Sequence, residues 1–133
     1  MIIAIDFDGI LCDNEFPKIG KPHYNIISYT RQLMDIGHEV ILWTSRTGAE
    51  LDSAIKWCDD YGLHFATVND NAPSNKRMYE KLYPQGTRKV YADIYIDDHN
   101  AEYLHLERHE HCGIEFIETI LKEGLTTWKT EEN

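Results

Sequence analysis

The sequence predicts an α/β fold with a doubly wound, mainly parallel sheet and helices on both of its faces. Short apolar runs rich in β-branched residues alternate with stretches of helical periodicity, an alternation typical of βαβ units. Two of the short runs end in acidic residues, as expected of strands whose carboxyl ends meet at a ligand site. The chain has 133 residues, 42% of them hydrophobic, which is enough for one domain with its own core.

The first apolar run leads directly into two carboxylates. Residues 2–9 read Ile-Ile-Ala-Ile-Asp-Phe-Asp-Gly, which predicts a buried strand followed at once by Asp6 and Asp8. Because alternate residues of a strand share a face, these two carboxylates should point the same way and repel each other unless a cation is present. Carboxylates favour Mg²⁺, and Mg²⁺ held by few protein ligands usually serves a phosphate.

The following segments supply the rest of the sheet and its helices. After a polar loop over residues 11–24, apolar spacing predicts a helix over residues 26–36 and then a strand over residues 39–43. Thr47-Gly48-Ala49-Glu50 has the spacing of a capping box, so the next helix should start at Thr47. The remaining expected elements are a strand at 64–68, a helix over about 75–83, a strand at 92–96 and a closing helix marked by Ile114, Ile117, Ile120 and Leu121.

The composition narrows the class of protein. The formal net charge of −10 disfavours extended nucleic-acid binding, which relies on positive charge facing the phosphates. The N-terminal apolar run is too short to span a bilayer, so no membrane partner is expected. The three cysteines include no Cys-x-x-Cys pair, which suits a reducing compartment. We therefore expect a cytoplasmic protein with a single domain over residues 1–125 and a polar tail over residues 126–133.

A second acid pair, Asp97 and Asp98, follows the last predicted strand. In open parallel sheets the ligand lies outside the carboxyl ends of the strands, so Asp97 should lie near Asp6 and Asp8. Asp6 is suited to attack phosphorus and form an aspartyl phosphate, while Asp8 could protonate the leaving alcohol and then deprotonate the attacking water. Mg²⁺ would neutralise the repulsion between carboxylates and phosphate, with Asp97 as a further ligand.

Four sequence features resemble, in order, the four motifs of the haloacid dehalogenase (HAD) superfamily of phosphatases. They are Asp6-Phe7-Asp8-Gly9, Thr44 at the end of the second strand, a lysine in the next segment, and Ile96-Asp97-Asp98. The resemblance covers about residues 1–100 and implies a Rossmann-like fold, bound Mg²⁺ and a small phosphate monoester, such as a sugar phosphate or a nucleotide, as substrate. By this likeness Asp8 is also a backbone metal ligand, Thr44 binds a phosphate oxygen, and Asp98 is a second acid at the metal.

The lysine of the third motif has two candidates. Lys76 begins the helix after the third strand, from where its ammonium could reach a phosphate. Lys89 lies eight residues before Asp97, roughly 26 Å away if the chain is extended. Small family members with a similar Arg-Lys-x-x-Ala-Asp-x-x-x-Asp-Asp stretch keep Lys89 open, but we favour Lys76.

The site is expected to be open, because the positions where the family commonly carries a cap module hold only a loop and one helix. An open site can take a bulky phosphoester, or a small one if the loop at residues 11–24 or a neighbouring subunit of a homo-oligomer supplies the lid. Ser45 and Arg46 are expected to bind substrate, although a surface ion pair is an equal alternative for Arg46. For Lys18, Lys21 and His23, solvated loop positions are favoured over substrate recognition.

Two other functions stay open. A phospho-accepting receiver domain also combines acids, a hydroxyl, a lysine and Mg²⁺ on a parallel sheet. Receivers, however, carry the acid pair on the first strand and the acceptor aspartate on a middle one, whereas here a second acid follows Asp6 by two residues. A module that binds Mg²⁺ and phosphate without turnover would need the same side chains as the phosphatase.

Two further groups of residues are interpreted as structural or incidental. The first is a run of metal-binding residue types whose spacing matches no common zinc pattern: His105, His109, His111 and Cys112. The second group, expected to pack rather than to stack on a ligand, is Trp43, Trp57 and Trp128.

Overall fold

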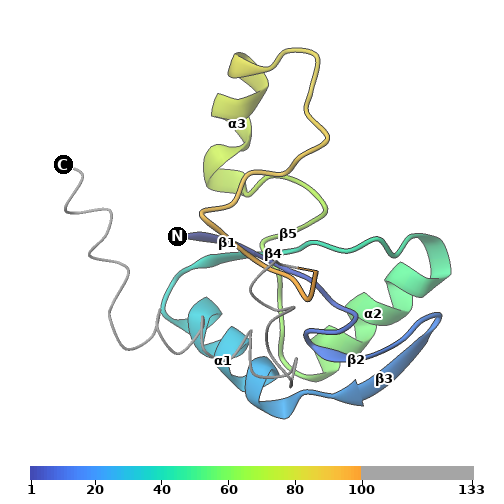
Figure 1. Cartoon of the computed structure of the whole chain (residues 1–133). Coiled ribbons are helices and arrows are strands. Elements are labelled where there is room, and N and C mark those ends of the chain that lie inside the picture. Colours follow the sequence, from blue (N-terminus) through green and yellow to red (C-terminus); the bar gives the residue numbers. More distant parts are fainter. Residues whose placement is uncertain (100–133) are drawn as a thin grey trace.

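The computed structural model describes residues 1–99, and a parallel sheet of four strands lies at the centre of this part of the chain (Figure 1). The strands stand in the order β5, β4, β1, β6, which gives the first strand of the chain a central position. Their bounds are β1 Ile2–Ile5, β4 Glu39–Leu42, β5 Thr67–Val68 and β6 Ile94–Ile96. The pairings between them are parallel, which confirms the predicted α/β class with a mainly parallel sheet.

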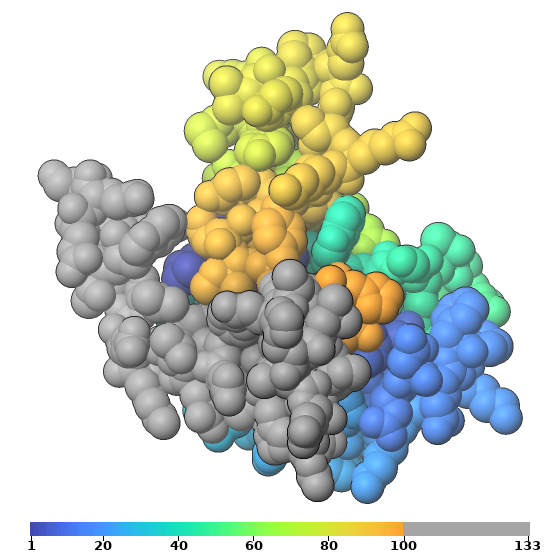
Figure 2. Space-filling view, in the orientation of Figure 1, coloured from blue at the N-terminus to red at the C-terminus, as the bar shows by residue number. Residues whose placement is uncertain are grey.

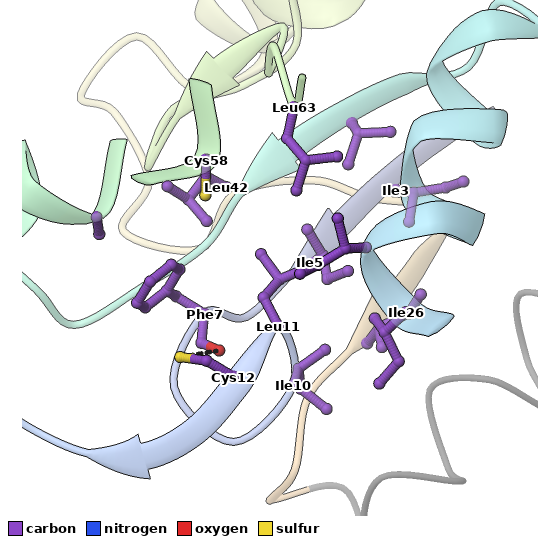
Figure 3. Close-up of a cluster of buried hydrophobic side chains, with 14 of the residues drawn as sticks. Ile3, Ile5, Phe7, Ile10, Leu11, Cys12, Ile26, Leu42, Cys58 and Leu63 are labelled. Atoms are coloured by element: carbon purple, nitrogen blue, oxygen red, sulfur yellow. Dashed lines mark hydrogen bonds between the residues drawn. The ribbon is translucent and has the colours of Figure 1, made fainter. Parts of the chain in front are cut away.

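Strand β1 is buried along its whole length, and its side chains enter two cores on opposite faces of the sheet. The helices around the sheet are α1 Tyr24–Asp35, α2 Gly48–Asp60 and α3 Pro73–Leu82. Ile3 and Ile5 pack with residues of α1 and α2 (Figure 3), whereas Ile2 and Ala4 pack with Ala72, directly before α3. Each fully buried isoleucine contributes about 1.5–3 kcal/mol, so β1 is a main source of stability.

The helices lie on two sides of the sheet. In Figure 1, α1 and α2 lie below the sheet and α3 rises above it. Figure 2 shows α3 and the segment that follows it, in yellow, standing out from the body of the molecule. This arrangement is compatible with a Rossmann-like fold, and it brings the carboxyl ends of β1, β4 and β6 to one edge.

The helices begin and end close to their predicted bounds, but one predicted cap is wrong. Thr47 is the residue before α2, yet its side chain makes no capping hydrogen bond, so the capping box with Glu50 is not formed. Thr47 is exposed, and water can satisfy the first N–H groups of the helix there.

Two strands are shorter than predicted, for identifiable reasons. Strand β5 has two residues and not five, because it is an edge strand and His64 before it turns outward to pair with Asp59 at 3.2 Å. Strand β6 starts at Ile94 because the side chain of Asp93, rather than a backbone carbonyl, accepts the Ile2 N–H at 2.7 Å. The Ala92 N–H donates to the Tyr95 hydroxyl at 3.0 Å instead of to a neighbouring strand.

Residues 11–24 are not the loop that their polarity predicts. They contain an antiparallel hairpin, β2 Cys12–Glu15 and β3 Lys18–Pro22, which we call the hairpin below. Its strands have little β propensity, and tertiary contacts hold them: Cys12 is fully buried, and the Gly9 N–H donates to the Cys12 carbonyl at 2.8 Å. Gly20 is also buried, close against the backbone of the opposite strand. The hairpin therefore follows directly on the first acidic motif.

Several predictions concern residues outside the described part of the chain. They are the closing helix around residues 114–121, the tail over residues 126–133, the group His105, His109, His111 and Cys112, and Trp128. Cys12 and Cys58 are free, buried thiols. Trp57 packs edge-on against Phe7 with ring centroids 5.4 Å apart, as predicted for a packing residue. Within residues 1–99, no helix is both long and apolar enough to cross a membrane.

Gly20 should be essential to the hairpin. A methyl group at this position would overlap the carbonyl oxygen of Asp13 on the opposite strand, and backbone cannot move aside as a flexible side chain can. We expect Gly20→Ala to lower the free energy of unfolding by about 1–3 kcal/mol in urea titrations. Lys21→Ala, at the exposed neighbouring position, is the control and should change it by less than about 0.5 kcal/mol. Equal stability of the two variants would contradict this packing.

Candidate active site

A cavity of about 550 Å³ lies at the carboxyl edge of the sheet. It is lined from three strands, because Asp6 follows β1, Thr44 stands two residues past β4, and Asp97 follows β6. In Figure 2 the last described residues, in orange, lie next to the blue N-terminal part of the chain. Among the predicted site residues that line the cavity are Asp6, Asp8, Thr44, Ser45, Arg46, Asp97 and Asp98. The structure therefore brings together most of the side chains that the motifs single out.

Three carboxylates, those of Asp6, Asp97 and Asp98, form an acid cluster in the cavity. Burial raises the pKa of Asp6 to about 8, with the negative charge of Asp97 as the next cause and Asp98 adding to it. Burial is also the main cause that raises the pKa of Asp98. Backbone groups orient two members, since the Phe7 N–H donates to Asp6 Oδ1 and the His99 N–H donates to Asp97 Oδ1, each at 2.8 Å. A cation bound between these carboxylates would relieve the repulsion among their negative charges.

The donor set of the acid cluster fits a hard divalent cation. Ligand atoms of Asp97, Asp98 and His99 all lie within 4.8 Å of one another, and Asp6 is close enough for both Asp97 and Asp98 to raise its pKa. Carboxylate oxygens are the ligands that Mg²⁺ prefers, whereas an imidazole is more typical of zinc and other transition metals. The residues that would hold Mg²⁺ are therefore Asp6, Asp97 and Asp98.

The Asp8 side chain is held by an arginine rather than by the acid cluster. Its two carboxylate oxygens accept hydrogen bonds from Nε and Nη2 of Arg46, both at 2.8 Å. This pairing is bidentate and charge-assisted, the strongest form of such a contact. It raises the pKa of Arg46 still further above its ordinary value. If Asp8 is a metal ligand, as predicted, it must therefore bind through its backbone carbonyl, as the family likeness implies.

Arg46 forms an ion pair, but a buried one, so its predicted surface position is wrong, while its predicted contact with substrate stays a prediction. Its side chain is 1% exposed. The sequence suggested a surface position because it places Arg46 in the loop after a strand. The side chain instead turns inward, because the hairpin covers it and Asp8 neutralises its charge. Ser45 beside it is exposed and lines the cavity, as predicted.

Thr44 is fixed at the cavity by an asparagine that the sequence did not indicate. The Asn69 side chain accepts from the Thr44 N–H at 2.8 Å and donates to the Thr44 carbonyl at 2.9 Å. Asn69 has a φ of 52°, a conformation that asparagine tolerates better than most residues. The Thr44 hydroxyl oxygen accepts from the Arg46 N–H at 3.1 Å, which leaves the hydroxyl hydrogen to donate to a ligand.

Neither candidate lysine lines the cavity. Lys76 pairs with Asp70 at 2.8 Å, and Asp70 stands two residues past β5, so this lysine lies at the carboxyl edge of the sheet but to one side. Lys89 lies over the ring of Tyr95 at 5.4 Å and lines a different cavity. It precedes β6, and the acid cluster follows β6, so Lys89 belongs to the opposite edge.

The side chains of four further residues enter the cavity, and the sequence did not indicate a role for them. Asn14 and Phe16 come from the hairpin, whose existence the polar sequence concealed. Trp43 was expected only to pack, and it does pack against the core around Ile2, but it also lines the cavity. The fourth is His99. It directly follows Asp98 in the sequence, and this adjacency could have indicated that it lies at the cavity.

The basic residues of the hairpin region lie elsewhere. Lys18 and Lys21 are exposed and do not line the cavity. His23 is bonded through both ring nitrogens, to the Ile10 carbonyl and to Asp13, each at 2.7 Å. Lys18 and Lys21 therefore match the interpretation of solvated positions, whereas that interpretation is wrong for His23, whose side chain is 11% exposed.

A comparison with solved structures finds a conserved protein from Bacteroides thetaiotaomicron with a TM-score of 0.72 and 32% sequence identity. The match covers 93% of this chain and 91% of that one. The chain belongs to the same family as this Bacteroides protein. No family model and no curated protein matches the chain. The likeness extends over nearly the whole length of both proteins, so the family shares the fold and not merely one motif.

The acid cluster predicts an unusual pH dependence of stability without divalent cations. Asp6 has a folded-state pKa of about 8, against an ordinary value of 3.8, so the folded state keeps a proton that the unfolded chain loses. The free energy of unfolding should therefore fall as the pH rises between these two values, by at least about 1 kcal/mol. Urea titrations in EDTA at about pH 5 and pH 8 would measure this difference.

Asp6→Asn and added Mg²⁺ provide the controls for this prediction. The asparagine cannot ionise, so the fall should shrink in the variant. Mg²⁺ should stabilise the wild type more at about pH 8 than at pH 5, because it binds the ionised form. The same pH dependence in wild type and Asp6→Asn would show that Asp6 does not titrate in this range.

Proposed function

We propose that the protein is a Mg²⁺-dependent phosphatase of the HAD superfamily, acting on a small phosphate monoester. The observation that supports this most directly is the meeting of the acid cluster with Thr44 in one cavity at the carboxyl edge of a parallel sheet. Asp6, Asp97 and Asp98 come from two strands that are adjacent in the sheet but far apart in sequence. Acids arranged in this way suit a reaction in which a cation and a phosphate meet.

In the proposed reaction, Asp6 acts as the nucleophile. A bond forms between an Asp6 carboxylate oxygen and phosphorus while the ester P–O bond breaks, and the leaving oxygen takes a proton from Asp8. Water then attacks phosphorus as Asp8 takes its proton back from it, the P–O bond to Asp6 breaks, and inorganic phosphate leaves with Asp6 restored. Thr44 donates its hydroxyl hydrogen to a phosphoryl oxygen. Bound Mg²⁺ would neutralise negative charge on the phosphoryl group and on the acid cluster.

The size of the cavity is consistent with a small organic phosphate as substrate. Its volume of about 550 Å³ lies within the range of small-molecule sites. Between β1 and α1 the described chain inserts only the hairpin, whose Asn14 and Phe16 contribute to the cavity wall. A sugar phosphate or a nucleotide fits these dimensions, with the hairpin forming part of the wall.

One observation favours a second candidate, a module that binds Mg²⁺ and phosphate without turnover. Both oxygens of Asp8 are bonded to Arg46, so only their remaining lone pairs can serve a leaving group while that pairing lasts. The candidate lysines also lie outside the cavity. The receiver alternative has no such support, because the order of its acidic motifs differs from the order in this chain.

Hydrolysis of an aryl phosphate should distinguish these candidates. Purified protein with Mg²⁺ should release phosphate from p-nitrophenyl phosphate, and Asp6→Asn should lower the rate at least about 1,000-fold, because it removes the nucleophile. EDTA should abolish the activity. Asp35→Asn, an exposed position at the end of α1, is the matched control and should retain full activity. Phosphate binding without release of product from any ester would favour the module.

The two lysines should differ in their effect on activity. We expect Lys76→Ala to lower kcat/KM about 10- to 100-fold, the usual loss for one charge-assisted contact to a phosphate. Lys89→Ala should change it less than about twofold, because Lys89 lies at the opposite edge of the sheet. Lys81→Ala, exposed on the same helix as Lys76, controls for general charge effects. A loss confined to Lys89→Ala would reverse the assignment.

A further inference from the structure

The guanidinium of Arg46 joins the proposed acid and base, Asp8, to the hairpin. We propose that Arg46 is a positioning residue that couples the two, so that the hairpin's placement and the orientation of the Asp8 side chain change together. The significance of this coupling for catalysis rests on the proposed phosphatase function. The coupling itself is a property of the fold and can be measured without any turnover.

The five N–H groups of the Arg46 side chain all have acceptors. Nε and one N–H of Nη2 donate to the Asp8 carboxylate, and the other N–H of Nη2 donates to the Lys18 carbonyl at 2.9 Å. Nη1 donates to the Pro17 carbonyl at 3.2 Å and to the Glu50 carbonyl at 3.3 Å. Two of these acceptors belong to the hairpin, and one lies in the first turn of α2. No donor of the guanidinium is left for a phosphate.

The same guanidinium is packed between two aromatic rings. Its carbon Cζ lies 5.0 Å from the ring centre of Phe7 and 5.1 Å from that of Phe16, within the range of cation–π contacts. Phe7 is fully buried in the core, whereas Phe16 belongs to the turn of the hairpin and lines the cavity. Phe16 thus contacts Arg46 and also forms part of the substrate-facing wall.

Burial explains why a change at Asp8 must reach the hairpin. A guanidinium that is 1% exposed is stable only while a counter-charge accompanies it, because an unpaired buried charge costs several kcal/mol. If Asp8 no longer provides that charge, Arg46 must move toward water. Phe16 and the carbonyl groups of Pro17 and Lys18 cover it, so this movement requires the hairpin to open.

The converse also holds, and it bears on the proposed reaction. The bidentate pairing fixes the orientation of the Asp8 carboxylate, so Asp8 can turn toward a leaving group only by exchanging at least one of its bonds to Arg46. Arg46 keeps those bonds as long as the hairpin fixes the other side of its guanidinium. A substrate that displaces Phe16 would therefore also loosen the hold on Asp8, which would link occupation of the cavity to the availability of the acid.

Hydrogen exchange of the intact chain tests the coupling directly. We expect Asp8→Asn, which removes the counter-charge, to speed amide exchange in residues 12–22 by about tenfold or more without substrate. Asp70→Asn breaks the exposed ion pair with Lys76 and is the matched control, in which exchange of these residues should stay at the wild-type rate. Hairpin exchange in Asp8→Asn within about twofold of the wild type would overturn the proposal.

Steady-state kinetics tests the positioning role. Arg46→Lys keeps the charge but has three donors in place of five, so it cannot hold both Asp8 oxygens and both hairpin carbonyls together. We expect kcat to fall about 10- to 100-fold with KM changed less than about threefold, because the phosphate contacts are unaffected. Arg31→Lys, which loses only an exposed contact to the Tyr61 carbonyl, should behave as the wild type.

The outcomes separate the coupling from the proposed function. An unchanged kcat in Arg46→Lys, with an active wild type, would overturn the positioning role. If the wild type hydrolyses no ester, the phosphatase proposal fails while the exchange experiment still decides whether Arg46 couples Asp8 to the hairpin. Faster hairpin exchange in Asp8→Asn together with a fall in kcat in Arg46→Lys would support both.

Discussion

The structure depends on how it accommodates negative charge at the end of its most buried strand. Strand β1 is apolar along its whole length, and the chain leaves the core directly into Asp6 and Asp8, with Asp97 and Asp98 arriving from the adjacent strand. Burial and proximity make these charges costly, as the raised pKa of Asp6 shows. The fold must therefore pair these charges with a cation or keep a carboxyl group protonated.

The protein meets this need in two different ways. Asp8 receives an internal cation, because Arg46 binds both of its oxygens and is itself enclosed by the hairpin and Phe7. The acid cluster has no comparable partner among residues 1–99, because the nearest basic group, the imidazole of His99, is exposed and 3.9 Å from Asp98. The acid cluster is therefore suited to a cation from solution, and the two neighbouring carboxylates of one motif differ in chemistry.

The sequence predicts the features that depend on local pattern, including the acid cluster, but not those that depend on tertiary contacts, including the pairing of Asp8 with Arg46. The strand before Asp6, its helical neighbours and the meeting of Asp6 with Asp97 depend on local periodicity and on the rule that parallel strands deliver their carboxyl ends to one edge. The hairpin depends on tertiary contacts, since its strands are polar and short of β-branched residues. The burial of Arg46 likewise requires a partner 38 residues away in sequence, which no local pattern reveals.

The commitment of Arg46 to the interior also bears on how a phosphate could be neutralised. With the five guanidinium N–H groups bonded within the protein, this arginine cannot share the charge of a bound phosphoryl group. The remaining positive charge would come from a cation on the acid cluster and from Lys76, whose ammonium Asp70 holds at the same edge of the sheet. That ion pair is half exposed, so breaking it costs little, and the flexible lysine side chain can exchange Asp70 for a phosphate.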